Sequence, residues 1–177
     1  MTTGSMTDRM LGALRLRSST YEEIEADQKA TGEAAFIIVA TSLVSGAVNG
    51  VLTGASDGFF GGLGAFLGWA FYAWVAYIVG VKLFPGPETN SSWGEVARTL
   101  GYANTPRFLL IFALVPGLTA TAQTIVGLWV LVATVVALRS ALDISTGRAI
   151  WIAIASAIGQ VVVIVAALAI ASALFPG

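Results

Sequence analysis

The chain has 177 residues, of which 56 per cent are apolar and 11 per cent are charged, and its net charge is −1. A soluble domain carries roughly 25 per cent charged residues, so this composition is typical of a membrane protein. The length allows one domain and leaves no room for a separate catalytic module. The nearly neutral charge argues against a nucleic-acid partner. Cys and His are absent, which excludes disulfides, thiolate nucleophiles and the commonest zinc, iron and haem ligands, and we expect no metal or cofactor.

The positions of the basic residues predict how the chain crosses the membrane. All nine Lys and Arg residues fall within residues 1–33, 82–107 and 139–148. The two other connections between apolar stretches, near Asp57 and near Pro116, have no basic residue. Basic connections of multi-span proteins stay on the cytoplasmic side. The alternation therefore predicts a multi-pass protein of the cell membrane with five spans, a cytoplasmic N-terminus and a C-terminus outside.

Residues 1–33 are predicted to form a cytoplasmic segment with an amphipathic helix. Apolar residues from 6 to 14 recur at helical spacing among arginines, which is typical of a helix lying on a membrane surface. A second helix is expected after Thr20, because Thr20 and Glu23 have the spacing of a capping box. Its acidic first turn is interpreted as a solvated face. We expect this second helix to continue into the first span.

Five apolar stretches are predicted as spans, because a helix needs about 20 residues to cross the hydrocarbon core. The third is short and is interrupted at Pro116, so a re-entrant segment is the alternative. A re-entrant segment would put Arg139 and Arg148 on the other side, so the charge pattern favours a crossing. The fold class is therefore all-α, a multi-span transmembrane helical bundle with short interfacial amphipathic helices. The predicted spans are about residues 34–56, 58–81, 107–119, 120–138 and 149–175.

Glycines recur at four-residue spacing through the first two spans. Glycines four residues apart let two membrane helices approach closely. We therefore predict a tight hairpin of these two spans around Asp57, and glycine-rich faces through which copies of the chain associate. The predicted helix-packing residues are Gly46, Gly50, Gly54, Gly58, Gly62, Gly64 and Gly68.

The segment between the second and third spans holds the best candidates for a binding function. Ser92 and Glu95 form a capping box, which predicts an amphipathic helix along the cytoplasmic interface. A mechanical role is the alternative, in which Gly101 ends this helix and Pro106 begins the next. In the binding interpretation, the arginines of this segment suit phosphate. The candidate residues for a partner or a lipid headgroup are Arg98, Tyr102, Asn104, Thr105, Pro106 and Arg107.

The stretch Gly-Tyr-Ala-Asn-Thr-Pro at residues 101–106 resembles the Gly-Tyr-x-x-x-Pro motif of the Yip family, the Ypt/Rab-interacting membrane proteins. Residues 21–27 and 142–150 are similar to segments of prokaryotic members. This resemblance implies a five-span bundle with a cytoplasmic N-terminus. Eukaryotic relatives are associated with small GTPases and with vesicle traffic. The chain lacks their long N-terminal region and their Asp-Leu-x-Gly-Pro motif, so the resemblance gives a small GTPase partner little support.

The spans themselves contain few groups that could carry chemistry. Apart from Arg107 at the start of the third span, they hold no acidic or basic side chain, which argues against proton pumps and voltage sensors. Without His there is no Ser-His pair, and no two acids within the spans could act as an aspartyl protease. We therefore expect a protein that is not an enzyme.

Two hypotheses follow from these limits. The first is a non-enzymatic membrane-organising scaffold or partner-docking module, in contact with the lipid bilayer and with further copies or other membrane proteins. The second is a channel or carrier for a neutral or lipidic substrate, using Asn49, Gln123 and Gln160. An accessory subunit of a larger membrane complex is not separable from the first hypothesis by sequence.

Overall fold

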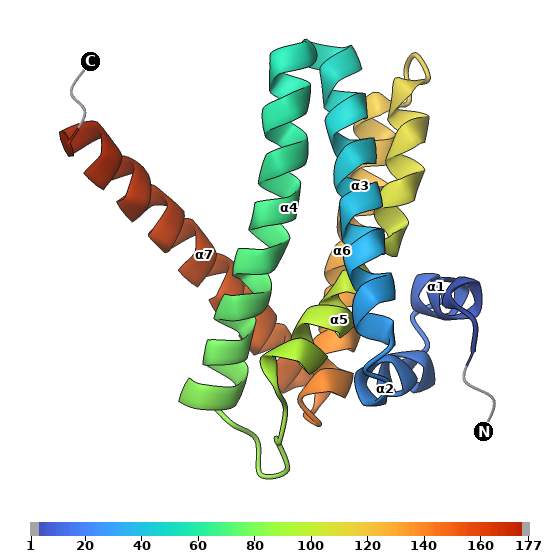
Figure 1. The fold of residues 1–177 in the computed structure, drawn as a ribbon, viewed down its shortest axis with the longest axis vertical. Helices are drawn as coiled ribbons and strands as arrows, with labels where there is room; N and C mark the ends of the chain where they lie inside the picture. The colour runs from blue at the N-terminus through green and yellow to red at the C-terminus, as the bar shows by residue number, and fades with distance from the viewer. Residues whose placement is uncertain (1–3, 175–177) are drawn as a thin grey trace.

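The structure, a computed structural model, describes residues 4–174, without the side chains of residue 164 and residues 166–174. Residue 175, the predicted end of the last span, lies outside the described residues. The described residues form helices and no strands (Figure 1). The elements are α1 (Met6–Leu14), α2 (Ser18–Ala26), α3 (Ala30–Thr53), α4 (Ala55–Tyr77), the π-helix η1 (Ile78–Leu83), α5 (Trp93–Ala103), the 3₁₀ helix η2 (Thr105–Leu114), α6 (Thr119–Ala141) and α7 (Thr146–Leu174).

Four helices are long and apolar enough to cross a membrane. They are Ala30–Thr53, Ala55–Leu83, Thr119–Ala141 and Thr146–Val163. The all-helical class is thus confirmed for the described residues, and the count of five spans remains a prediction.

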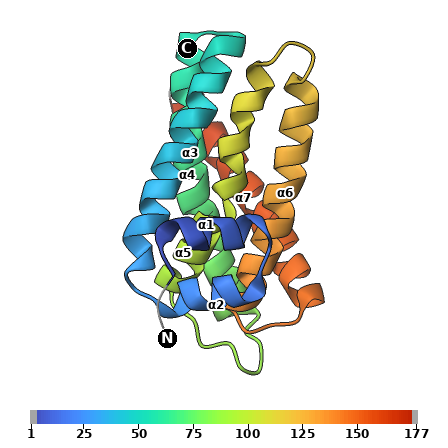
Figure 2. The same cartoon turned by 90° about the vertical axis from the view of Figure 1, so that its right-hand side faces the viewer.

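The helix η2 occupies the place of the predicted third span. A 3₁₀ helix rises about 2.0 Å per residue, so its ten residues extend about 20 Å, further than an α-helix of that length. The turn that follows it contains Gly117 at a φ of +82° and lies at the same end of the bundle as the turn at Gly54 (Figure 2). This placement agrees with the alternation of the charged connections.

The helices α3 and α4 pack as a hairpin along their glycines. A Cβ added at Gly58 would lie 2.6 Å from the Cα atom of Gly50 and 2.7 Å from the carbonyl oxygen of Gly46. Gly62 faces the same interface, where its Cβ would lie 3.1 Å from a backbone oxygen of α3. The turn itself is at Gly54, with a φ of +123°, rather than at Asp57. The close approach therefore depends on four of the seven predicted packing glycines and joins helices within one chain.

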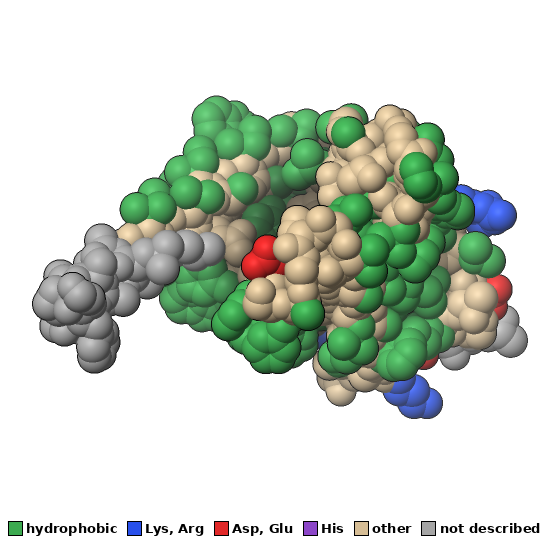
Figure 3. Space-filling model, turned by 90° about the horizontal axis from the view of Figure 1, so that it is seen from above, with side chains coloured by type: hydrophobic (Ala, Val, Ile, Leu, Met, Phe, Trp, Pro, Cys, Tyr) green, Lys and Arg blue, Asp and Glu red, His purple; other side chains and the backbone are tan. Residues whose placement is uncertain are grey.

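The opposite end of the bundle carries the basic residues and is called the charged end below. It holds α1, α2 and α5, together with the C-terminal ends of α4 and α6 and the N-terminal end of α7 (Figure 1). Viewed from the end that carries the Gly54 turn, the largest basic side chains in sight lie at the rim of the surface (Figure 3). α1 lies across the bundle axis, as expected for a helix on a membrane surface (Figure 2).

The helix α5 begins as predicted but lies deeper than expected. Ser92 and Glu95 form the predicted capping box, which confirms the start of this helix. Every residue from Val96 to Ala103 is buried, because α5 packs against α2, α3, α4 and α6. The polar residues of α5 therefore face protein rather than water.

The acidic segment before the first span also differs from the expectation. α2 begins at Ser18 and has no side-chain cap, so the predicted capping box of Thr20 and Glu23 is wrong. The expected continuous helix is also wrong, because α2 ends at Ala26 and α3 begins at Ala30. This break frees the acidic side chains for the contacts described next.

Candidate functional site

A buried arginine at the charged end binds three carboxylates from two other helices and the turn between them. Arg9, in α1, is 2 per cent exposed. Its Nε atom lies 3.0 Å from the Glu23 carboxylate, and its Nη atoms lie 2.5 Å from Asp27 and 3.0 Å from Glu33. The hydrogen bond from Arg9 lowers the pKa of Asp27. These ion pairs fasten α1, α2 and the start of α3 together, and we call the four residues the Arg9 cluster.

The predicted Gly101 to Pro106 segment attaches α5 to this cluster. The Tyr102 hydroxyl donates a hydrogen bond to the Glu33 carboxylate, and the Tyr102 side chain is fully buried. Burial raises the pKa of Tyr102, so the hydroxyl stays protonated and available as a donor. A Cβ at Gly101 would lie 2.8 Å from the Cβ of Ala34, so glycine is what lets α5 meet α3 here.

The remaining residues of the segment shape the junction between α5 and η2. Thr105 is buried, and its hydroxyl donates to the Tyr102 carbonyl at 2.6 Å. The Asn104 amide donates to the Leu100 carbonyl at 2.8 Å. Pro106 is buried in the first turn of η2, a position that needs no backbone N–H donor. Four of the six candidate residues thus make contacts within the protein. The expected end of α5 at Gly101 is wrong, because the helix continues to Ala103.

Arg98 caps the C-terminal end of α2 by donating hydrogen bonds to its last carbonyls. It is 6 per cent exposed, and its Nε atom lies 2.9 Å from the carbonyl oxygens of Ile24 and Glu25. These carbonyls have no partner within the helix, so the arginine satisfies them. Its Nη2 atom also bonds the Glu25 carbonyl and lies 3.8 Å from the Glu95 carboxylate. Burial raises the pKa of the nearby Glu25 carboxyl to about 7. Arg98 is thus engaged within the protein.

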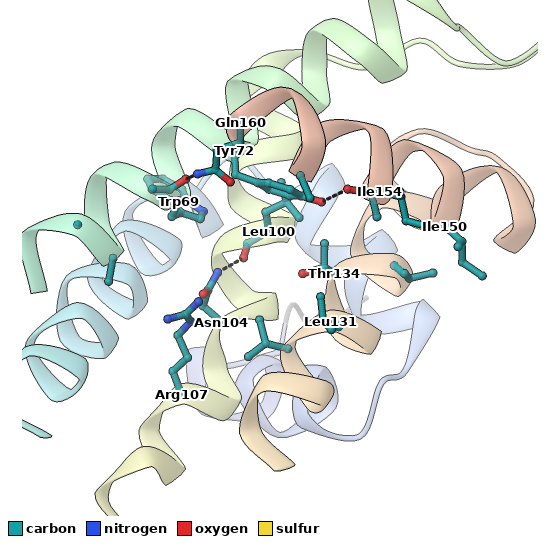
Figure 4. A pocket seen from close by; sticks show the side chains of 17 residues that line it. Trp69, Tyr72, Leu100, Asn104, Arg107, Leu131, Thr134, Ile150, Ile154 and Gln160 are labelled. Atoms are coloured by element: carbon teal, nitrogen blue, oxygen red, sulfur yellow. Dashed lines mark hydrogen bonds between the residues drawn. The ribbon is translucent and has the colours of Figure 1, made fainter. Parts of the chain in front are cut away.

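Arg107 has different surroundings, because it lines a cavity of about 500 Å³ between α4, α6, α7 and the junction of α5 and η2 (Figure 4). Two of the polar side chains in the wall bond backbone carbonyls: Tyr72 donates to Ala153 at 3.2 Å, and Gln160 donates to Gly68 at 2.8 Å. The polar side chains of the wall are Trp69, Tyr72, Asn104, Arg107, Thr134 and Gln160.

Two donors in this wall have no acceptor. The indole Nε1 of Trp69 and the guanidinium Nε of Arg107 are buried and make no hydrogen bond within the described part of the protein. The four ion pairs found among the described residues do not include Arg107. An unsatisfied buried donor costs about 1–3 kcal/mol, and more when it is charged. Arg107 thus gives the cavity wall a positive charge that has no carboxylate partner among the described residues.

Comparison with known families gives one match. The family model of the Yip1 domain matches residues 11–171. The chain belongs to the Yip1 domain family. The match spans α2 to α6 in full and α7 as far as residue 171, so this Yip1 domain includes both the Arg9 cluster's acidic residues and the cavity. Neither the curated proteins nor the solved structures give a match.

The polar residues that suggested a carrier do not converge in this Yip1 domain. Asn49 lies beside Gly61 between α3 and α4, where its amide would be 2.7 Å from an added Cβ. Gln123 is exposed on α6. Gln160 alone reaches the cavity, from α7. A pathway formed by all three is therefore absent from the described residues.

Sequence reasoning missed the Arg9 cluster and the cavity. The acidic turn was interpreted as solvated, although Glu23 and Asp27 are four residues apart and so lie on one face of a helix. That spacing was the available signal for a shared cation. Trp69 and Tyr72 line the cavity, and no sequence pattern distinguishes a cavity wall from a lipid-facing surface.

Proposed function

We propose that this Yip1 domain acts by contact, as a non-enzymatic membrane-organising scaffold that docks a partner at its charged end. The Yip1 domain and the four apolar helices indicate a membrane protein. The observation that carries the docking role is the Arg9 cluster, which holds α1, α2 and α3 in one fixed arrangement and reaches α5 through Tyr102. A surface that is rigid before binding loses less conformational entropy when a partner docks.

The outer face of this arrangement is exposed and mixed in character. Arg15, Arg17 and Glu22 are exposed and supply both signs of charge, and Leu11 of α1 is 44 per cent exposed. Charged residues around an apolar contact are typical of surfaces that recognise another protein. We propose that this face lies in the cytoplasm, as the charge pattern predicts, and binds another membrane protein or a second copy.

The carrier hypothesis receives less support. Its three polar residues lie in separate places, as described above. An accessory subunit of a larger complex would use the same docking face, so the experiment below addresses both.

Photocrosslinking in native membranes tests the docking role. A photoreactive amino acid at residue 15 or 22 reports on the charged end, and the same amino acid at Leu128, 59 per cent exposed on α6, is the control for random lipid-phase encounters. We expect a discrete crosslinked product from the charged end and none from Leu128. The Arg17→Glu variant should lose that product, because it reverses a charge on the docking face.

The identity of the product completes the test. A product of twice the chain mass would make a second copy the partner, and a larger or smaller product would make it another protein. Monomeric protein from both charged-end positions, or equal products from Leu128, would overturn the docking proposal.

A further inference from the structure

We propose that the cavity beside Arg107 binds one anionic phospholipid, with the lipid phosphate at the Arg107 guanidinium and the acyl chains directed outward between α6 and α7. This site goes beyond the docking function, which uses the exposed face of α1 and α2. The inference rests on the missing counter-charge, on the composition of the wall and on its opening to the apolar surface.

The first step is the charge balance of the cavity. Arg107 is the only charged residue in the wall, and its guanidinium has no carboxylate partner among the described residues. Arg107 is half-buried, whereas the two buried arginines have partners: Arg9 binds three carboxylates and Arg98 binds two carbonyls. Burying a charge without a partner is costly, so an anion from outside the chain is the missing partner.

The second step is the kind of anion. The guanidinium of Arg107 is a donor only, and a phosphate offers it several acceptor oxygens in a geometry that matches its planar fork. The wall contains no Asp or Glu that would neutralise the ammonium group of a zwitterionic headgroup. The cavity therefore favours a headgroup whose net charge is negative.

The third step is the apolar part of the ligand. Leu100, Leu131, Ile150 and Ile154 line the same cavity. Three of them continue onto the outside of the bundle, where Leu131 is 64 per cent exposed, Ile154 48 per cent and Ile150 42 per cent. A free phosphate ion would leave this apolar surface unused. A cavity of about 500 Å³ lies within the range of sites that hold small ligands, so a headgroup and the first part of its chains fit.

Lipid binding to the purified full-length protein tests the proposal. Native mass spectrometry and thermal stabilisation in detergent would compare phosphatidylglycerol with phosphatidylcholine of the same acyl chains, and with inorganic phosphate alone. We expect phosphatidylglycerol to bind at least about tenfold more tightly than phosphatidylcholine, and inorganic phosphate to give no stabilisation. About tenfold corresponds to one charge-assisted contact.

Two variants test the site in different ways, one by removing its charge and one by filling its volume. Arg107→Gln removes the charge and should weaken phosphatidylglycerol binding about tenfold. Gly64→Leu keeps Arg107 but fills the cavity, because an added Cβ at Gly64 meets no atom within 4 Å, and it should reduce binding of the lipid at least as much. The matched controls are Arg139→Gln, an exposed arginine of α6, and Gly127→Leu, a glycine with open space outside the cavity.

Three results would overturn the proposal. They are equal affinity for the two lipids, stabilisation by inorganic phosphate alone, and wild-type affinity in both the Arg107 and the Gly64 variant. If Arg107→Gln fails to fold, the Gly64→Leu variant decides. Crosslinking from the charged end is read in a separate assay, so loss of the lipid site and loss of the docking function are distinguishable.

Discussion

Arg9 is the residue on which the charged end depends. It is almost completely buried, and the carboxylates that it binds lie 14, 18 and 24 residues further along the chain. Leu16, between α1 and α2, has a φ of +56°, which is unusual for a residue with a side chain. This turn folds α1 back onto α2, and no sequence pattern indicated it. The acidic residues could be found from sequence, and their partner could not, because the pairing depends on the turn.

Replacing Arg9 should destabilise the protein strongly. Arg9→Gln leaves Glu23, Asp27 and Glu33 facing one another without a cation, and we expect a loss of about 2–4 kcal/mol of unfolding free energy. Denaturation of the purified protein in detergent measures this loss. Arg15→Gln, on the exposed side of α1, should change the free energy by less than about 0.5 kcal/mol. Similar losses in the two variants would contradict the structural role of Arg9.

Among the elements, the hairpin of α3 and α4 could be predicted and η2 could not. Glycines at four-residue spacing indicate that two helix backbones can approach closely. In the structure, the backbones of α3 and α4 approach in this way at Gly46 and Gly58. A 3₁₀ helix has no equivalent pattern, because its apolar residues look like those of a short α-helix. With the rise of an α-helix, the stretch before Pro116 is predicted to be shorter than the 3₁₀ helix that it forms.

Alanine at Gly58 should weaken the hairpin. Alanine favours a helix over glycine by about 1 kcal/mol, but here its Cβ would lie 2.6 Å from backbone atoms that have no room to move. We expect the clash to prevail, with a net loss of about 1–3 kcal/mol in unfolding free energy. At Gly127 the space is open, so Gly127→Ala should be neutral or slightly stabilising. A stabilising Gly58→Ala would show that the two helices do not pack this closely.

For the whole molecule, the charge pattern predicted that the basic connections between helices lie at the same end of the bundle. Thr89 donates to the Leu142 carbonyl at 2.7 Å, and Arg148 donates to the carbonyls of Phe84 and Pro85 at 2.9 and 2.6 Å. These bonds join the two later basic connections directly. The cavity could not be anticipated, because it exists where α7 diverges from α4 (Figure 1), and the angle between two helices is set by tertiary packing.

Cysteine labelling should determine the number of crossings, and the chain offers a cysteine-free background. With five crossings, Glu88→Cys and Ser145→Cys react with an impermeant maleimide from the same side of sealed vesicles. Ser56→Cys and Thr121→Cys then react from the opposite side. Solubilised protein should label at all four positions, which controls for local burial. Labelling of residues 88 and 145 from opposite sides would mean that η2 does not cross.

The Arg9 cluster also constrains the order of events while the chain is being made. Its carboxylates are available once the start of α3 has been synthesised, but Tyr102 and Arg98 belong to α5, which follows both helices of the glycine hairpin. The contacts of this segment with α5 can therefore form only after about residue 103 has been synthesised. A slow step in forming the hairpin would leave the last carbonyls of α2 without Arg98, and Glu33 without Tyr102, for as long as that step lasts.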